Sequence, residues 1–271
     1  MFTVVIPILN QFDVTRYYFQ SWLNQAKCQF ETIFIDNGSD VSFSKSQIFL
    51  QWKNEFDVKC IRNENNVGVY PTFQQAITHC SNPFIFYSHN DVEMLEFGWD
   101  EKIKNILTRI IRETGKVPGV CGMFGAKGIG TRDIYDAPYD YRQLMRWNCV
   151  TVPSMVSAGG NAITKSFERV IVLDGFSLIV SKKMISDALK GEFDYKRYPV
   201  HHNYDNDICL DSHFGGFANY VIDVDCKHHG GLTSTKEKWA EKMGTSDLKI
   251  HRLAHKVMYE KFRNRLPIWV K

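Results

Sequence analysis

Short apolar runs alternate with segments of helical periodicity along the first part of the chain. The apolar runs are rich in β-branched and aromatic residues, as buried strands are, and they cover Phe2–Ile8, Glu31–Ile35, Val58–Arg62 and Phe84–Tyr87. The segments between them place apolar side chains at helical spacing, and they include Val14 to Gln25 and Phe73 to Cys80. Strands and helices in this order predict an α/β fold with a mostly parallel sheet and helices on both faces.

Polar side chains follow three of these predicted strands. Asp36 follows the second strand, the loop Asn65–Gly68 follows the third, and Asp91 follows the fourth. Because right-handed crossovers bring the carboxyl ends of parallel strands to one edge of a sheet, we expect these groups to converge there. Open α/β sheets bind their ligands at that edge. The pattern therefore predicts a ligand site, with Asp91 as the first candidate for a metal-linked or phosphate-linked group.

The second half of the chain is less regular. A helix is predicted around Ile103–Ile110, and a glycine-rich strand over Gly119–Gly130. Residues 131–168 are polar and rich in tyrosine and glycine, and they predict an irregular insertion of the kind that forms binding loops. The elements predicted after it are strand material over Val170–Val180, helices over Lys183–Lys190 and Tyr204–Leu210, and a strand over Tyr220–Asp225 that leads to His228-His229-Gly230-Gly231.

The tail from Lys249 to Lys271 contains seven lysine or arginine residues and one acidic residue, Glu260. Its apolar residues fall at helical spacing, at Ile250, Leu253, Ala254, Val257, Met258 and Phe262. This combination predicts an amphipathic basic helix. The basic face is either simply solvated or binds an anionic partner, and the pattern leaves both DNA and an anionic membrane surface open.

Composition narrows the class of protein. The 271 residues are 44% hydrophobic and 23% charged, which excludes disordered and fibrous chains. The formal net charge of +3 is too small to indicate a nucleic-acid partner by itself. No run approaches the roughly 18 apolar residues of a membrane span, and the N-terminus lacks the basic segment of a signal peptide. Seven scattered cysteines without a C-x-x-C pair are typical of a reducing compartment, so we expect a cytoplasmic protein.

Several short motifs resemble, in the right order, the GT-A fold of family 2 glycosyltransferases. They are Val4-Val5-Ile6-Pro7, Phe34-Ile35-Asp36-Asn37-Gly38-Ser39, Asn66-Val67-Gly68, Asn90-Asp91-Val92, Leu173-Asp174-Gly175-Phe176, Tyr204-Asp205-Asn206-Asp207 and His228-His229-Gly230-Gly231. The resemblance implies a catalytic domain over residues 1–235, followed by a basic helical extension over 236–271. Within the domain, 1–95 would bind the nucleotide-sugar, and 119–235, with the insertion 131–168, would bind the acceptor.

The resemblance also implies roles for individual residues. Asp36 matches the carboxylate that binds the nucleotide base, and the remaining donor-binding positions are Pro7, Ile8, Asn66, Gly68, His89, Asn90 and Asp174. Asp91 matches the last residue of the D-x-D motif and would hold a metal, together with His228 or His229. The chain departs from that motif because His89 stands at its first acidic position. Asp205 matches the catalytic base, and Asp207 is the second candidate.

Such an activity needs a Mn²⁺ or Mg²⁺ ion to neutralise the leaving diphosphate, and a carboxylate to take the proton of the acceptor hydroxyl. A single base opposite the leaving group implies inversion at the anomeric carbon. The implied donor is a nucleotide-diphospho-sugar, with uridine as the preferred base.

The acceptor stays open between a glycan or its precursor and a modified base of DNA, the latter in a host cytoplasm if the protein comes from a phage. A different hypothesis is a non-catalytic nucleotide-sugar-binding protein that kept the fold, and His89 at the first acidic position favours it. Asp36 and Asp205 also have plainer interpretations, as a turn former and a helix N-cap.

Overall fold

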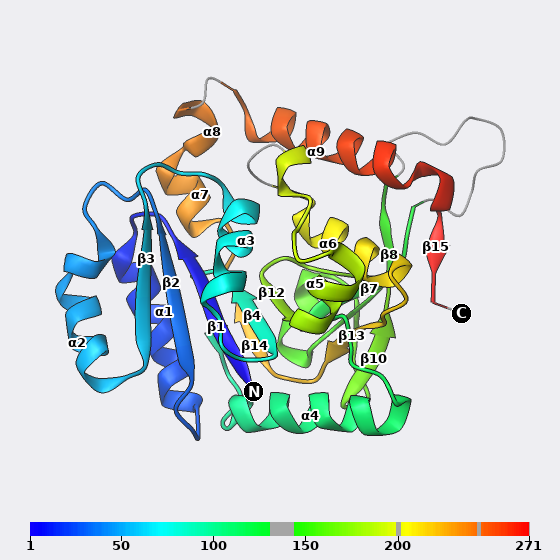
Figure 1. Ribbon diagram of the computed structural model, residues 1–271, viewed down its shortest axis with the longest axis horizontal. Helices are drawn as coiled ribbons and strands as arrows, with labels where there is room; N and C mark the ends of the chain where they lie inside the picture. The colour runs from blue at the N-terminus through cyan, green and yellow to red at the C-terminus, as the bar shows by residue number, and fades with distance from the viewer. Residues whose placement is uncertain (131–143, 199–201, 243–244, 271) are drawn as a thin grey trace.

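The computed structural model describes residues 1–130, 144–198, 202–242 and 245–270, and Figure 1 shows the arrangement of their helices and strands. The strands are β1 (Phe2–Ile8), β2 (Glu31–Asn37), β3 (Val58–Asn63), β4 (Phe84–Ser88), β5 (Val92–Met94), β6 (Val120–Gly122), β7 (Phe124–Ile129), β8 (Arg146–Thr151), β9 (Asn161–Ala162), β10 (Phe167–Val170), β11 (Val172–Leu173), β12 (Ser177–Ser181), β13 (Asn219–Ile222), β14 (Cys226–His228) and β15 (Ile268–Trp269). The α-helices are α1 (Phe12–Gln25), α2 (Gln47–Glu55), α3 (Val69–His79), α4 (Trp99–Thr114), α5 (Lys182–Leu189), α6 (Tyr204–Phe214), α7 (Leu232–Glu237), α8 (Trp239–Lys242) and α9 (Asp247–Phe262).

The central sheet has eight strands in the order β10-β13-β6-β12-β4-β1-β2-β3. The four strands predicted from the first part of the sequence, β1 to β4, pair in parallel and confirm the α/β class. In the other half, β12 runs antiparallel to both β4 and β6, and β10 runs antiparallel to β13. The sheet is therefore parallel from β4 to β3, as predicted, and mixed beyond β4.

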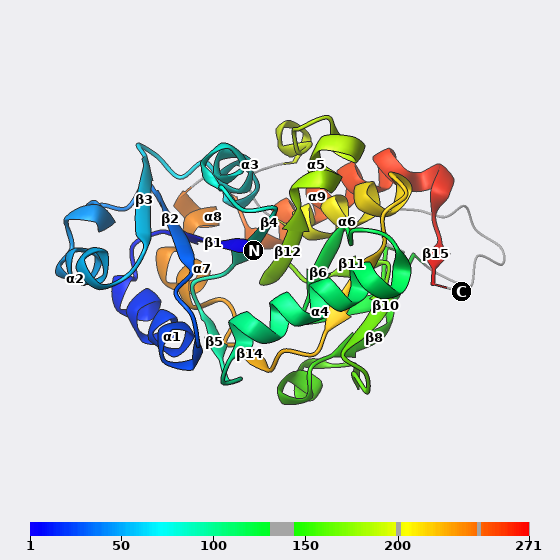
Figure 2. The same cartoon turned by 60° about the horizontal axis from the view of Figure 1, so that its bottom comes forward.

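Successive side chains of a strand point to opposite faces of the sheet, so the core consists of two layers, one on each face. Val5 and Ile33 point into the layer covered by α3, α5, α6 and α9, whereas Val4 and Phe34 point into the layer covered by α1, α2 and α4. Figure 2 brings α4 to the front, where it lies along the sheet. Because both faces are covered, the strand interiors are apolar throughout, and ligand access is restricted to the sheet edge.

The predicted strand Gly119–Gly130 is wrong in one respect, because it forms two strands in two different sheets. β6 joins the central sheet, while β7 pairs with β8, β11 and β15 in a second, antiparallel sheet. Glycines on either side of the break between β6 and β7 allow the backbone of other strands to approach closely. A Cβ on Gly122 would lie 2.5 Å from Ser177 O, and one on Gly125 would lie 2.6 Å from Val172 O.

The prediction of an irregular insertion over 131–168 is also wrong for its second part. Residues 144–168 contain β8, the 3₁₀ segment Pro153–Ala158 and β9, and β10 begins at Phe167. Residues 131–143 lie outside the described residues. The polar side chains of this segment misled the prediction, because the first four residues of β8 are partly buried or exposed and only Val150 and Thr151 are buried.

The basic C-terminal helix is confirmed as α9, but it ends at Phe262, before the 3₁₀ turn Arg263–Arg265 and β15. Figure 1 shows it crossing the side of the molecule opposite α4. Ala254, Met258 and Phe262 are buried in the same core layer as α6. Among the described residues, no helix is long and apolar enough to cross a membrane.

Lys261 anchors α9 in the core. Its Nζ donates to Asp207 Oδ1 at 2.8 Å and to Asp211 Oδ2 at 2.7 Å, and it lies 3.2 Å from Asp194 Oδ2. Asp207 is fully buried and also accepts hydrogen bonds from the Tyr70 and Tyr198 hydroxyls. Ionised carboxylates at this depth need a counter-charge, and Lys261 provides it.

Replacing Lys261 with methionine is expected to lower the free energy of unfolding by about 3–5 kcal/mol, the usual cost of leaving a buried charge without its partner. Urea denaturation measures the change. Lys256→Met is the matched control on the same helix, because Lys256 is 60% exposed, and the expected change there is within about 0.5 kcal/mol. Equal effects of the two substitutions would contradict this anchoring role.

Asp211 gives the fold a pH dependence of its own. Burial and then the charge of Asp207 raise the pKa of Asp211 to about 6, although Lys261 opposes the shift. The folded state therefore binds this proton more tightly than the unfolded state, whose aspartate pKa is about 3.9. The contribution to stability is full below about pH 4 and is lost as the pH rises through about 6.

The measured quantity is the free energy of unfolding of the wild type minus that of the Asp211→Asn variant. This difference should fall by about 1–3 kcal/mol between pH 4 and pH 6.5. Denaturant titrations at several pH values give this difference, in which the titration of the other carboxylates cancels. A difference that stayed flat or rose across the window would contradict the raised pKa.

Candidate active site

A cavity of about 640 Å³ lies at the carboxyl ends of β1 and β4. It is lined by Pro7, Ile8, Leu9, Asn37, Asn66, Gly68, Val69, His89, Asn90, Asp91, Leu144, Arg146, Asp174, Gly175, His202, Asn203, Tyr204, Asp205, Asn206, His228, Gly231, His251 and His255. This is the edge at which the sequence predicts a ligand site, and ten of the thirteen predicted site residues line the cavity.

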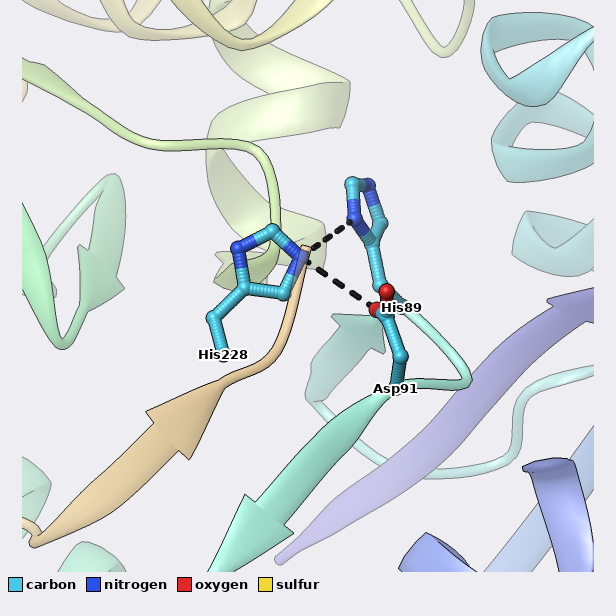
Figure 3. Close-up of side chains that lie close together, drawn as sticks. All are labelled: His89, Asp91 and His228. Atoms are coloured by element: carbon cyan, nitrogen blue, oxygen red, sulfur yellow. Dashed lines mark hydrogen bonds and ion pairs between the residues drawn. The ribbon is translucent and has the colours of Figure 1, made fainter. Parts of the chain in front are cut away.

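The short antiparallel ribbon of β5 and β14 brings His228 beside Asp91. Asp91 is in the turn between β4 and β5, and His228 pairs with Val92, the residue that follows it. The ring of Phe176 stacks on the imidazole of His228, with centroids 4.8 Å apart and planes 16° apart, and fixes its orientation. Figure 3 shows that His89, from the same turn as Asp91, points toward the same space.

His89, Asp91 and His228 have the arrangement expected of metal ligands. One ligand atom from each lies within 4.8 Å of the other two. His228 Nε2 lies 3.3 Å from His89 Nδ1 and 3.2 Å from Asp91 Oδ1, close to the separation of about 3 Å between neighbouring ligands of an ion with bonds near 2.1 Å. Asp91 is 4% exposed, and its Oδ1 has no hydrogen-bond partner among the described residues. A buried carboxylate oxygen in this state fits a divalent cation.

The hydrogen bonds of His89 are compatible with a lone pair on its Nδ1. Its Nε2 lies 2.7 Å from the Tyr204 hydroxyl, and this hydroxyl can accept from Nε2–H when it donates to Gly175 O at 3.3 Å. Burial, and then the charge of His228, lower the pKa of His89, so that its imidazole is neutral near pH 7. A neutral imidazole whose second nitrogen is hydrogen-bonded is the usual form of a histidine ligand.

Arg146 holds two carboxylates that line the cavity. Its Nη2 donates to Asp205 Oδ2 at 2.7 Å, and its Nη1 donates to Asp174 Oδ2 at 3.0 Å. Asp205 Oδ2 also accepts from Gly175 N at 3.0 Å. Burial would raise the pKa of Asp174, but Arg146, together with His228 and His89, lowers it below its usual value. The guanidinium of Arg146 thus orients both carboxylates near the N-terminus of α6.

The side of the cavity where the sequence predicts nucleotide binding is built from two packed turns. Asn66 Oδ1 accepts from Asn37 Nδ2 at 2.8 Å and from Gly68 N at 2.9 Å. Gly38, at φ +87°, allows the turns to meet, because a Cβ there would lie 2.5 Å from Asn65 C. Pro7 and Ile8 line the cavity beside them. Asn90 also lines it, and its Nδ2 donates to Thr15 Oγ1 at 3.1 Å.

Three predicted site residues do not reach the cavity. Asp36 is fully buried, and its oxygens accept from Ser39 N, Phe43 N and Arg62 Nη1, so it supports the turn after β2. Asp207 lies about 200° around α6 from Asp205 and faces α9 instead. His229 lies 2.9 Å from Glu93 Oε2 and stacks against Tyr18 at 4.6 Å. Of the two candidate histidines, the cavity contains His228.

Several lining residues were missed by the sequence analysis. Arg146 was hidden in the polar insertion, and Asn203 precedes the motif around Asp205. His251 and His255 are on α9, outside the segment that resembled a catalytic domain. Their i, i+4 spacing in His251-Arg252-Leu253-Ala254-His255 was a visible signal, because it places both imidazoles on one face of a helix.

Comparison with known proteins relates the first part of the chain to a family. Residues 3–113, less than half of the chain, match the model of a family described as "Glycosyl transferase family 2". These residues are similar to that family. They include β1 to β5, and therefore the turn that contains His89 and Asp91. No curated protein matches the chain in sequence.

Solved glycosyltransferase structures share the fold of the chain. GalNAc-T7 with UDP, GalNAc and Mn²⁺ matches 97% of it at 13% identity and a TM-score of 0.60. S. aureus TarS 1–349 in complex with UDP matches 82% at 14% identity and a TM-score of 0.51. The mannosyltransferase PcManGT from Pyrobaculum calidifontis, in complex with GDP-Man and Mn²⁺, matches 98% at 11% identity and a TM-score of 0.51. The predicted GT-A fold is confirmed.

The chain covers 55% of the GalNAc-T7 structure, 57% of the TarS structure and 70% of the PcManGT structure. It therefore spans little more than half the length of the first two. At identities this low, the likeness establishes the common fold, and the chemistry has to be argued from the residues of this chain itself.

Titration with Mn²⁺, followed by the electron paramagnetic resonance of the free ion with and without UDP, tests the metal group. Asp91→Asn and His228→Ala should each weaken Mn²⁺ binding at least about tenfold, a loss that even outer-shell partners of a metal can cause. His229→Ala is the matched control from the neighbouring position, and it should bind within about twofold of the wild type. If His229→Ala lost affinity as strongly as His228→Ala, the assignment of His228 would be wrong.

Proposed function

We propose that this protein is a metal-dependent, inverting glycosyltransferase that moves a sugar from a nucleotide-diphospho-sugar to an acceptor hydroxyl. The observation that carries the proposal is the unpartnered buried oxygen of Asp91, which converges with two imidazoles in the cavity at the sheet edge. In the proposed division of labour, residues 1–95 bind the donor and residues 119–235 bind the acceptor.

The metal would be held by Asp91, His89 and His228, together with oxygens of the donor diphosphate. When bound, a divalent ion supplies Lewis-acid neutralisation of the charge that develops on the leaving diphosphate. Two imidazoles beside one carboxylate favour Mn²⁺ over Mg²⁺, which prefers an all-oxygen set. In this proposal His89, at the first position of the D-x-D motif, is a metal ligand. Its presence there then no longer favours the hypothesis of a non-catalytic binding protein.

Asp205 is the proposed base. Its carboxylate lines the same cavity, and Arg146 and Gly175 N hold one oxygen in place while the other remains available beyond its short contact with Asn206 N. The acceptor hydroxyl would lose its proton to Asp205 as its oxygen attacks the anomeric carbon, and the bond to the diphosphate would break on the opposite side. One displacement of this kind inverts the anomeric configuration.

The donor base and the acceptor are proposed by class. Solved structures of similar fold are complexes with UDP, UDP-GlcNAc or GDP-Man, which supports a nucleoside-diphosphate-sugar donor, and we prefer uridine as its base. A glycan or glycan precursor is the proposed acceptor. A modified base in DNA is the second candidate, because the outward face of α9 carries Lys249, Arg252 and Lys256. Salt-dependent binding of duplex DNA in a gel-shift assay would favour DNA.

The proposal is tested by incubating the protein with Mn²⁺ and a panel of UDP- and GDP-sugars, and by measuring the release of nucleoside diphosphate. Release should require Mn²⁺ and should be lost in Asp91→Asn. Asp205→Asn should lower the rate of transfer by about 10²- to 10⁴-fold, the usual contribution of a general base, while donor binding stays within about threefold. Proton NMR of the product should show the inverted anomer.

Asp207→Asn distinguishes the two predicted bases. It replaces a buried carboxylate that faces Lys261, so it should lower stability but leave the rate per folded molecule within about threefold of the wild type. A rate loss in Asp207→Asn that matched the loss in Asp205→Asn would reassign the base. If no donor were turned over but one bound tightly, the binding-protein hypothesis would replace this proposal.

A further inference from the structure

The C-terminal helix α9 contributes to the cavity, although it lies well beyond the residues that match the family. His251 and His255 project from one face of α9, and their ring centroids are 4.3 Å apart. Both line the cavity that contains the metal group and Asp205. His202, from the segment before α6, lies next to them, with its ring centroid 4.9 Å from that of His251.

The wall of the cavity formed by His202, His251 and His255 is held in place from both ends of α9. At the carboxyl end, Lys261 is paired with Asp207 and Asp211 of α6. At the amino end, Asp247 Oδ1 lies 2.8 Å from His202 Nε2, so the same loop that precedes α6 is tied to the first turn of α9. The positions of the two imidazoles are therefore fixed by contacts that are independent of a ligand.

Asn203 provides independent evidence that this wall of the cavity binds a ligand. It lines the cavity and is 7% exposed, and its Nδ2 is buried without a hydrogen-bond partner among the described residues. Its Oδ1 accepts from Asn206 Nδ2 at 2.9 Å, and its backbone is in the left-handed region at φ 57°. A buried amide donor without an acceptor is unfavourable, and an oxygen of a ligand would satisfy it.

The wall is polar but carries little positive charge. Burial, and then His251, lower the pKa of His255 to about 4, and burial followed by His202 lowers the pKa of His251. Both imidazoles are thus neutral near pH 7, when each offers one hydrogen-bond donor and one acceptor. The charged groups that act on these imidazoles are Asp247, Asp205 and Arg146, and Arg146 is already engaged with Asp205 and Asp174. A phosphate or carboxylate would meet a net negative surface here.

We propose that Asn203, His251 and His255 form the acceptor subsite, and that this subsite takes the uncharged, hydroxyl-bearing part of the acceptor, such as a sugar ring. The proposal rests on the function proposed above and specifies its acceptor side. The subsite is connected to the proposed base through side chains, because Asn203 bonds Asn206, Asn206 bonds Arg146 and Arg146 bonds Asp205. A hydroxyl held by the two imidazoles would lie in the part of the cavity that also contains Asp205.

Ligand-observed NMR on the full chain tests the subsite directly, with Mg²⁺ and UDP present because Mg²⁺ does not broaden the signals. The probes are the methyl glycosides of glucose, galactose, mannose and N-acetylglucosamine, with glucose 6-phosphate as the anionic probe. At least one methyl glycoside should bind. His255→Leu and Asn203→Gly should each raise its Kd at least about tenfold, as expected when one buried hydrogen-bonding group is lost. Glycine is chosen at 203 because it keeps the positive φ.

Two further variants separate binding from folding. His255→Gln keeps a neutral side chain with a donor and an acceptor, so it should bind the glycoside within about threefold of the wild type. Leu253→Gln changes a half-exposed residue of α9 that does not line the cavity, and it should leave the Kd unchanged. Thermal unfolding of each variant shows whether a loss of binding follows from a loss of structure.

The outcomes are distinct. The subsite is refuted if none of the methyl glycosides binds, if His255→Leu and Asn203→Gly bind them as well as Leu253→Gln does, or if glucose 6-phosphate binds more tightly through the same residues. Glycoside binding that depends on His255 and Asn203, in a protein that turns over no nucleotide-sugar with Mn²⁺, would support the subsite and reject the transferase function. The two proposals can therefore fail separately.

Discussion

A carboxylate buried at the end of a strand needs a counter-charge, and the site depends on how the chain meets this need at Asp91. Among the described residues, Asp91 Oδ1 accepts no hydrogen bond; His228 Nε2 lies 3.2 Å from it, and His89 Nδ1 lies 3.3 Å from that same nitrogen. Two other buried carboxylates have several partners. Asp36 has an arginine and two backbone N–H groups, and Asp207 has a lysine and two tyrosines. Asp91 differs from these two in the way expected of a carboxylate that receives an external cation.

Three separate parts of the chain have to meet for this arrangement to exist. The turn after β4 supplies His89 and Asp91, the β5–β14 ribbon supplies His228, and the loop between β11 and β12 supplies Phe176, which stacks on His228. Tyr204 at the start of α6 lies within hydrogen-bonding distance of His89 Nε2 and helps to orient its ring. The two halves of the fold are thus joined through the metal group, and neither half would form it alone.

The sequence predicted what depends on local pattern and missed what depends on distant partners. Strands β1 to β4 carry continuous apolar runs, so their parallel pairing and the position of Asp91 followed from periodicity and handedness. The family resemblance assigned Asp36 to the nucleotide base, although an aspartate before Asn37-Gly38 can also serve a turn. Arg62, which donates to Asp36, comes from the neighbouring strand, so this contact could not be read from the sequence. Arg146 was hidden for the same reason, since its partners Asp174 and Asp205 are far along the chain.

Helix α6 explains why the two ends of the protein are coupled. Successive residues of an α-helix turn by about 100°, so Asp207 and Asp211 share one face while Asp205 lies on nearly the opposite one. The first face binds Lys261 and fixes α9, and the second face presents Asp205 to the cavity. Because α9 carries His251 and His255 back over that cavity, the contact that stabilises the C-terminal helix also completes the wall opposite the metal group. The outer face of α9 is therefore basic, and its inner face is a structural part of the site. Charge patterning along the sequence reveals only the outer face.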